Sequence, residues 1–305
     1  MKVLVLGGGT SNEREVSQRS ANNVAEAASQ AGYEVRQADP ADGLDFLDNL
    51  SSETIVFPIL HGAGGEDGVI QAELEKRNLP YLGSDSRTSE NCWNKYRTLT
   101  KLKEHEIKIA RGDLVTYEEF LNHEITAAPY VLKVVHGGSS LGVLIVRDTK
   151  KVSPEQINEV FAMESPALLE ELVRGTEITV PVLDNVALPV IEIHPPQGKE
   201  FDYENKYNGE SQEACPPVSV PEHLQKAAQE IAEKVHEIMG CRHFSRTDMM
   251  ITPQEEIIVF DVNTIPGLTR QSLYPNSAAV AGLPMPELMK RFAEMVKRDF
   301  KLGDE

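Results

Sequence analysis

Two neighbouring apolar runs in the last quarter of the chain carry side chains that could bind a divalent cation. Arg246 and Asp248 are two residues apart on the first run, so they share one face of a strand. Asp261 and Asn263 share a face of the second run in the same way. If the runs form a hairpin that turns at Gln254–Glu255, Asp248 and Asp261 lie opposite each other and repel unless a cation lies between them. Oxygen donors without His or Cys suit Mg²⁺, so we predict a magnesium site; a solvated hairpin face is the alternative.

A lysine in an apolar strand gives a second candidate. Lys133 lies within Tyr130–Val135, where unpaired burial of its charge would cost several kcal/mol, so it needs an anionic partner or a route to solvent. Six residues later, Ser139 lies in the glycine- and serine-rich segment His136–Gly142. A hydroxyl-bearing glycine hairpin beside a lysine predicts a phosphate lid, and a plain hairpin loop is the alternative.

The segment His61–Gly68 contains four glycines, which permit close approach of the backbone to a ligand. His61 follows a predicted strand, at the end where open α/β sheets bind ligands. The acidic residues Glu66 and Asp67 could instead cap the next helix.

The first glycine cluster, Gly7–Gly9, resembles a dinucleotide-binding turn, but the position that requires the third glycine is Asn12. No Gly-Lys-Ser/Thr follows, so a P-loop is excluded. Thr10 and Glu13 have the spacing of a capping box, and on spacing alone Glu13 is structural.

A turn at Pro266–Gly267 follows the predicted metal ligands directly. Such a turn can direct backbone N–H groups at an anion, and an ordinary turn is the alternative.

Composition restricts the class of protein. The chain has 305 residues, enough for two or three domains, and its 30 basic and 48 acidic side chains give a net charge of −18. This charge disfavours nucleic acid and anionic membranes as partners. The three cysteines, Cys92, Cys215 and Cys241, are far apart, so neither a disulfide framework nor a zinc motif is predicted. No long apolar run is present, so we expect a cytoplasmic protein without a membrane span.

These side chains need a scaffold of alternating strands and helices followed by a strand-rich part. The predicted strands are Val3–Leu6, Tyr33–Ala38, Ile55–Leu60, Tyr130–Val135, Val143–Val146, Ile178–Leu183, Val186–Ile193, Phe244–Ile251 and Ile257–Val262. The predicted helices are Thr10–Gln30, Val69–Arg77, about Asn91–His105, one capped by Thr116, one that begins at Ser153-Pro154, Pro221–Met239, one near Ser277, and Pro286–Phe300. The first ninety residues follow a βαβ order that predicts a parallel sheet, although Pro58 cannot donate to a ladder. Residues 197–219 predict a long functional loop.

Nine segments, in this order and spacing, resemble the D-alanine–D-alanine ligases of the ATP-grasp superfamily. They are Gly8–Ser17, His61–Gly68, Asn94–Arg97, Gly138–Gly142, Glu170–Glu177, Asp202–Tyr207, Arg246–Asp248, Asn263–Gly267 and Ser272–Leu273. The resemblance implies an α/β protein, α+β in its ATP-binding part, with an ATP-grasp fold and an N-terminal Rossmann-like parallel-sheet domain. It implies an N-terminal domain of residues 1–92, a central subdomain of residues 93–177 and a C-terminal domain of residues 178–305.

The resemblance also implies ATP as a co-substrate, together with two Mg²⁺ ions or Mn²⁺ in their place. In the family the corresponding residues would bind ATP phosphates through Lys95, Lys133 and Lys206, and the nucleoside through Glu170 and Glu177. The metal ligands would be Asp248, Asp261 and Asn263, where Asp261 replaces the usual Glu.

For catalysis, the resemblance implies Glu13, Ser139, Tyr207, Arg246 and Gly267. For substrate binding, it implies Glu13, His61, Ser272 and Leu273. Glu13 would contact the ammonium of the first amino acid, and Gly7–Gly9 would bind no nucleotide.

The activity implied is ATP-dependent joining of two D-alanines through an acyl phosphate, for peptidoglycan precursor synthesis, by a homodimer. One alternative is a D-alanine–D-lactate ligase or another ATP-grasp amino-acid ligase, although Tyr207 favours an amine as the second nucleophile. A catalytically weak nucleotide-binding regulator is the other alternative, and the departure at Asp261 is its only support.

Overall fold

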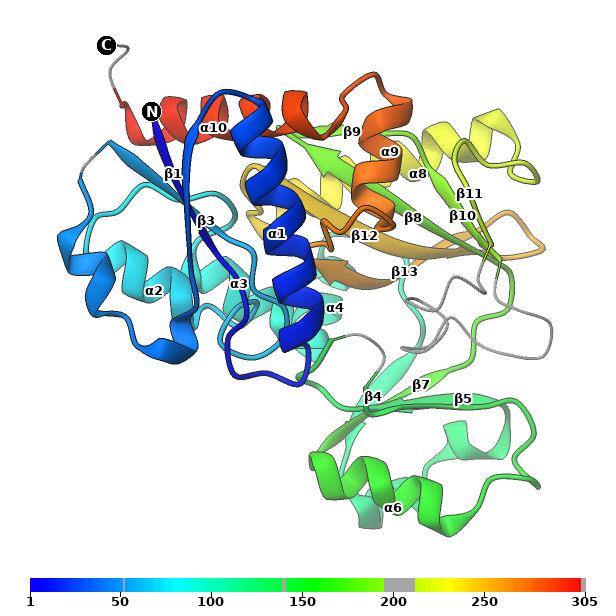
Figure 1. Ribbon diagram of the computed structural model, residues 1–305. Coiled ribbons are helices and arrows are strands. Elements are labelled where there is room, and N and C mark those ends of the chain that lie inside the picture. Colours follow the sequence, from blue (N-terminus) through cyan, green and yellow to red (C-terminus); the bar gives the residue numbers. More distant parts are fainter. Residues whose placement is uncertain (52, 139–140, 195–211, 303–305) are drawn as a thin grey trace.

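The computed structural model describes residues 1–51, 53–138, 141–194 and 212–302, and this part of the chain forms three sheets (Figure 1). The first sheet is parallel, with the order β2-β1-β3, as the βαβ pattern predicts. Its elements are β1 (Lys2–Leu6), α1 (Arg14–Gln30), β2 (Glu34–Ala38), β3 (Thr54–Pro58), α2 (Val69–Lys76) and the 3-10 helices Pro40–Asp42 and Asp45–Asn49. Because side chains alternate along a strand, Val3 and Val5 of β1 pack with α1, whereas Leu4 and Leu6 pack with α2.

The helix after the glycine turn begins at Arg14, later than the predicted Thr10. Glu13 is the N-cap residue, and its side chain makes no capping hydrogen bond. The Ser11 hydroxyl accepts a hydrogen bond from the Glu13 N–H (3.2 Å) and donates to the His61 carbonyl (2.6 Å), which keeps this segment in a loop. The capping-box prediction is therefore wrong, and the Glu13 side chain serves another purpose.

The second sheet is antiparallel, with the order β4-β7-β5-β6. Its elements are β4 (Gly112–Val115), α5 (Tyr117–Phe120), the 3-10 helix Glu124–Ala127, β5 (Tyr130–Lys133), β6 (Val143–Val146), α6 (Pro154–Met163) and β7 (Ala167–Glu171). The predicted hairpin of β5 and β6 is confirmed, and Thr116 and Ser153 cap α5 and α6 with complete capping boxes. Strand β7 was not predicted.

Two helices replace the single helix predicted over Asn91–His105. They are α3 (Ser86–Trp93) and α4 (Lys95–Glu104), and both pack beside the third sheet. The break falls at Asn94, whose backbone is extended and whose side chain accepts a hydrogen bond from the Arg97 N–H at 2.9 Å. Asn94 therefore caps α4 and puts Lys95 at its first position.

The third sheet has the order β11-β10-β8-β12-β13, with β9 paired to β8. Its strands and helices are β8 (Thr176–Leu183), β9 (Val186–Ala187), β10 (Ile191–His194), β11 (Gln212–Ala214), α8 (Glu222–Met239), β12 (Phe244–Ile251), β13 (Ile257–Asn263), α9 (Leu273–Val280) and α10 (Met285–Phe300). The predicted β12–β13 hairpin is confirmed, with Asp248 directly opposite Asp261. Helix α8 packs on one face of this sheet. The helix ends at Met239, as predicted, and Gly240 after it has the left-handed conformation.

Two predicted strands are shorter in the structure. β3 ends at Pro58 rather than Leu60, although the Ile59 N–H still donates to the Leu6 carbonyl of β1 at 2.9 Å. The strand predicted over Val186–Ile193 is split into β9 and β10, because Pro189 lies between them.

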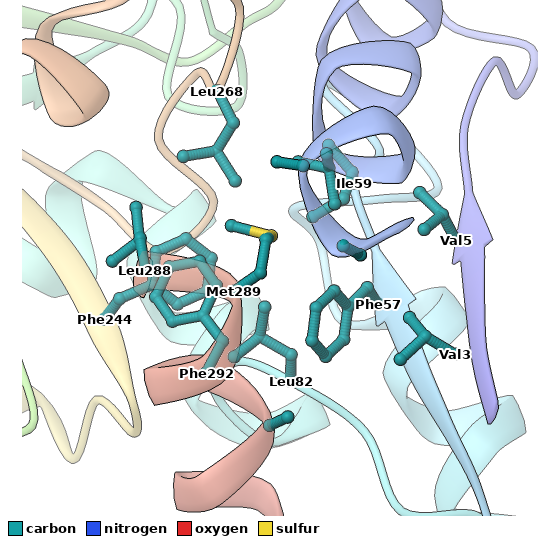
Figure 2. Packing of buried hydrophobic residues seen from close by; sticks show 14 of the residues in the cluster. Val3, Val5, Phe57, Ile59, Leu82, Phe244, Leu268, Leu288, Met289 and Phe292 are labelled. Carbon is teal, nitrogen blue, oxygen red and sulfur yellow. The ribbon is translucent and has the colours of Figure 1, made fainter. Parts of the chain in front are cut away.

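One apolar core joins the first sheet to the C-terminal part of the chain. Figure 2 shows Phe244 of β12 and Leu288, Met289 and Phe292 of α10 facing the side of β1 and β3 that carries Phe57. A helix from the end of the chain thus completes the N-terminal core. In the described ranges, no helix is both long enough and apolar enough to cross a membrane. The domain boundaries after residues 92 and 177 stay predictions.

Candidate functional site

A cavity of about 440 Å³ is lined by residues from or next to all three sheets. In Figure 1 the second sheet lies below the third, and α1 and its preceding loop lie beside them. Every predicted site residue within the described ranges lines this cavity: Glu13, His61, Lys95, Lys133, Glu170, Glu177, Arg246, Asp248, Asp261, Asn263, Gly267, Ser272 and Leu273. Segments that are up to 260 residues apart in the sequence (Leu273 minus Glu13) therefore meet at one place.

The side of the cavity formed by the second sheet contains a buried ion pair. Lys133 on β5 and Glu170 on β7 are 6% and 4% exposed, and Nζ lies 2.7 Å from Oε2. Glu170 is thus the anionic partner that the sequence required for Lys133. The other carboxylate oxygen of Glu170, Oε1, is buried and has no hydrogen-bond partner in the described chain. An unpaired buried acceptor that lines a cavity is suited to an N–H donor on a ligand.

Lys95 links the second and third sheets across the cavity. Its backbone N–H donates to the Val135 carbonyl at 3.0 Å, which fixes the start of α4 against the strand that carries Lys133. Its Nζ donates to the carbonyl of Gly137 and lies 4.0 Å from Oδ1 of Asp261. Two lysines from different elements therefore supply positive charge to one cavity.

The β12–β13 hairpin presents its polar side chains to the same cavity. Arg246 donates two hydrogen bonds of 2.8 Å to Asp248, from Nε to Oδ1 and from Nη2 to Oδ2. The Thr179 hydroxyl also donates to Asp248, at 2.5 Å. The opposed carboxylates of Asp248 and Asp261 therefore each have a cation nearby, Arg246 for the first and Lys95 for the second.

The donor set here is two carboxylates and an amide. Among the described residues no three His, Cys, Asp or Glu side chains are grouped so that they could hold a metal ion. With the Asn263 amide added, however, the hairpin offers oxygen atoms alone, which is the chemistry of a hard cation such as Mg²⁺. The residues present thus fit Mg²⁺ in the type of their donor atoms. The Asp248 carboxylate would interact with both Arg246 and the metal ion.

Acidic side chains from the segments that follow β1 and β3 gather at another part of the cavity. Glu13 is 5% exposed. A Cβ on Gly62 would lie 2.9 Å from its Oε2, and a Cβ on Gly138 would lie 2.8 Å from it, so these glycines leave room for the carboxylate. His61 is held by Ser20, with Nε2 3.0 Å from Oγ, and its Nδ1 lies 3.5 Å from Glu66 Oε1. Burial raises the pKa of Glu66, and the nearby charge of Glu13 raises it further. Two carboxyl groups in one buried place suit a cationic ligand group.

The turn after β13 leads into α9. Ser272 is the N-cap residue of α9, and its Oγ accepts a hydrogen bond from the Thr269 N–H at 3.0 Å. A Cβ on Gly267 would lie 2.9 Å from the same oxygen, so glycine allows the turn to close on Ser272. Backbone N–H groups near a helix N-terminus suit an anion, as the sequence predicts.

Three predicted residues, Ser139, Lys206 and Tyr207, lie outside the described residues, so their roles stay predictions. The structure adds residues to the cavity that were interpreted otherwise or given no role. They are Glu66, for which capping of the next helix is the alternative role, and Cys92 and Trp93, to which the sequence assigns no chemistry. Glu213 also lines the cavity, and it lies in a stretch predicted as loop.

Comparisons with known proteins identify relatives over the whole chain. The model for the D-ala D-ala ligase N-terminus matches residues 34–84, and that for the D-ala D-ala ligase C-terminus matches residues 102–294. A D-alanine–D-alanine ligase from Maridesulfovibrio salexigens is 35% identical over 304 residues, which span 99% of this chain and 100% of the relative.

Solved structures agree with this match. The crystal structure of D-alanine–D-alanine ligase from Bacillus anthracis aligns with a TM-score of 0.86 and 29% identity, covering 99% of both chains. A structure of that ligase complexed with ATP aligns with a TM-score of 0.84 and 27% identity, again over 99% of both chains. The chain therefore belongs to the D-alanine–D-alanine ligase family and has the ATP-grasp fold.

Proposed function

We propose that this protein joins two D-alanines into D-alanyl-D-alanine, a peptidoglycan precursor, with ATP as the co-substrate. The observation that carries the proposal is one shared cavity. The segments after β1 and β3 contribute carboxylates to it, the second sheet a lysine, and the third sheet a set of oxygen donors beside an arginine. Membership of the ligase family supports the same activity.

In the first step, the carboxylate of one D-alanine attacks the γ-phosphorus of ATP, so that an acyl phosphate forms and ADP leaves. Glu13 would hold the ammonium of this D-alanine, and its burial beside Glu66 and His61 supports that role. Lys95 and Lys133 would bind phosphates, with Lys206 and Ser139 as further predicted contacts. Catalysis of phosphoryl transfer depends mainly on such positioning and charge stabilisation.

The nucleoside would lie against the second sheet. Glu170 has a buried oxygen without a hydrogen-bond partner in the described chain, which supports its predicted contact with the adenine amino group. Glu177 is the second residue of β8 and lines the same cavity, which supports its predicted contact with the ribose hydroxyls.

Asp248, Asp261 and Asn263 would hold Mg²⁺, because they present only oxygen donors to the cavity that the lysines line. When bound, Mg²⁺ offsets the negative charge of the transferring phosphoryl group. Arg246 already neutralises Asp248 and would keep that carboxylate oriented.

In the second step, the amine of the other D-alanine attacks the acyl carbon and phosphate leaves. Arg246 and the Gly267 N–H would stabilise the oxyanion of the tetrahedral intermediate, a contribution of about 3–4 kcal/mol per donor in comparable sites. Ser272 and the Leu273 N–H would fix the carboxylate of the second substrate, and the N-cap position of Ser272 supports this. Tyr207 would help to exclude water.

Phosphate release from ATP tests the proposal in three parallel assays: with D-alanine, with D-alanine plus D-lactate, and with neither. We expect release that depends on D-alanine and Mg²⁺ and a dipeptide product. The D-lactate ligase and the weak regulator are not favoured, because the similar proteins described above are D-alanine–D-alanine ligases and both matching family models describe that family. A depsipeptide product would favour the D-alanine–D-lactate ligase. If D-alanine does not stimulate phosphate release from ATP, the ligase function is refuted.

The proposal includes a cytoplasmic homodimer. Sedimentation velocity tests the dimer.

A further inference from the structure

Glu213 is a cavity carboxylate that none of the roles above uses. It lies on β11, the edge strand of the third sheet, and lines the cavity together with Arg246, Ser272 and Leu273. Within the described chain, no hydrogen bond or ion pair involves its carboxylate. Its side chain is only partly exposed, so its charge is partly removed from water without a fixed partner.

The strand register places Glu213 on the cavity face. Its direct neighbour on β10 is Ile193, whose neighbour on β8 is Glu177. Residues directly opposite in an antiparallel sheet point to the same face, so Glu213 and Glu177 lie on one face, about 10 Å apart across two strand spacings. The cavity therefore contains a row of side chains that begins at Glu213.

The packing of Ile193, the neighbour of Glu213 in this row, shows where in the cavity Glu213 lies. Ile193 and its strand neighbour Ile191 pack against Leu273, the first residue of α9, in one apolar cluster. Cys215, which follows the end of β11, packs against this cluster too. Glu213 therefore lies next to the Ser272–Leu273 turn.

Among the described residues of the third sheet, the charged groups on the same face as Glu213 are Glu177 on β8, Arg246 and Asp248 on β12, and Asp261 on β13. Glu192 and His194 flank Ile193 and point to the opposite face of β10. Burial raises the pKa of Glu213 to about 7, and the charge of Arg246 opposes this rise. A carboxylate with such a pKa can both accept and release a proton near neutral pH.

We propose that the Glu213 carboxylate is the general base for the second substrate and accepts a proton from the ammonium of the second D-alanine. This inference rests on the proposed ligase function. The resulting amine lone pair forms the C–N bond at the acyl carbon, and the C–O bond to the phosphoryl group breaks with its electron pair leaving on phosphate. The second proton lost from nitrogen goes to the departing phosphate, and Glu213 releases its proton to solvent.

The other carboxylates of the cavity are occupied or lie elsewhere. Both oxygens of Asp248 are bound by Arg246, and Glu170 is paired with Lys133. Asp261 lies 4.0 Å from Lys95, Glu171 is paired with Arg111, and Glu177 is assigned to the ribose hydroxyls. Glu13 and Glu66 gather around His61, on the side of the cavity proposed for the first substrate. Glu213 is thus the carboxylate next to the Ser272–Leu273 turn with no fixed partner in the described chain.

Hydroxylamine provides the test, because it is an uncharged nucleophile near neutral pH and needs no base to attack an acyl phosphate. For Glu213→Gln we expect the kcat for dipeptide formation to fall by about 10²-fold or more. The same variant should form D-alanyl hydroxamate from ATP, D-alanine and hydroxylamine at the wild-type rate. In the wild type, kcat for the dipeptide should rise with pH through about 7, and this rise should be lost in Glu213→Gln and partly kept in Glu213→Asp.

Glu222→Gln is the matched control, since it makes the same chemical change at an exposed position of α8 and should leave both products unchanged. The inference is overturned if Glu213→Gln forms dipeptide at the wild-type rate, or if it loses hydroxamate and dipeptide equally while it melts at the wild-type temperature. If the wild type itself shows no D-alanine-dependent phosphate release, it is the ligase function that fails.

Discussion

At the scale of single residues, Glu13 reaches the cavity through space that Gly62 leaves free. Gly62 has φ +77°, and a Cβ on it would lie 2.9 Å from both Glu13 Oε2 and Ser11 Oγ. Gly64 has φ +83°, yet a Cβ on it would meet nothing within 4 Å. The two positions share a left-handed backbone but differ in what surrounds them. Substitutions at the two positions therefore distinguish the effect of backbone strain from the effect of crowding Glu13.

Alanine at these two glycines should therefore have different effects on activity. Each variant should lose about 1–2 kcal/mol of unfolding free energy, because L-residues are disfavoured in this conformation. Only Gly62→Ala should also displace Glu13, lowering kcat/KM for D-alanine by about 10²-fold. Urea unfolding and steady-state kinetics check this. Equal loss of activity in Gly64→Ala would show that loop strain, rather than the position of Glu13, controls the site.

At the scale of elements, the break between α3 and α4 positions Lys95. The Asn94 side chain caps α4 and also contacts the ring of His136, with Nδ2 3.0 Å from Nε2. The strand that carries Lys133 and the helix that carries Lys95 are thereby joined at one residue. Thr116 caps α5 by an analogous hydrogen bond to the Glu119 N–H, but it does not line the cavity.

Removing the Asn94 cap and the Thr116 cap in turn should distinguish an effect on stability from an effect on nucleotide binding. Asn94→Ala and Thr116→Ala should each cost about 1 kcal/mol, measured by thermal or urea unfolding. Asn94→Ala alone should raise KM for ATP, by about tenfold, because Lys95 loses its fixed position. Asn94→Asp keeps the cap oxygen and should restore most of the affinity. A normal KM in Asn94→Ala would mean that the contact with Val135 alone holds Lys95.

At the scale of the whole molecule, two buried histidines connect separate parts of the fold. His243 before β12 accepts a hydrogen bond from the Gly83 N–H at 2.9 Å and lies 3.1 Å from Asp299 of α10. His236 of α8 is bonded to Ser245 of β12, with Nδ1 2.7 Å from Oγ. Burial lowers the pKa of each ring to about 4.

Stability should therefore fall as the solution is acidified below pH 6.5. Between pH 6.5 and 4 the unfolded chain binds protons at both histidines and the folded chain does not, so the free energy of unfolding decreases as pH falls. Each histidine contributes about 3 kcal/mol to this decrease by pH 4. In urea unfolding at stepped pH, His236→Gln should reduce the slope of unfolding free energy against pH. His223→Gln, at an exposed position of the same helix, is the control. An unchanged slope in His236→Gln would contradict the buried neutral state.

Much of the fold and site could be predicted from the sequence, because local patterns determine them. The βαβ order predicted the parallel sheet, side-chain alternation predicted the face shared by the polar residues of β12 and β13, and the charge of Lys133 required an anionic partner or a route to solvent. The misplaced elements have local physical causes: the Asn94 cap divides one apparent helix, Pro189 divides a strand, and the Ser11 hydroxyl holds Glu13 outside α1.

The tertiary structure alone decided which side chains share the cavity. Nothing in the sequence near Glu213 indicates that Ile193 pairs with it and packs against Leu273, because strand pairing and packing join segments that are distant along the chain. Local propensity and periodicity act over a few residues, whereas the meeting of the first and third sheets depends on the packing of α10 against the first sheet. The sequence by itself therefore determined the chemistry available to this protein, and only the tertiary structure decided which groups meet in the cavity.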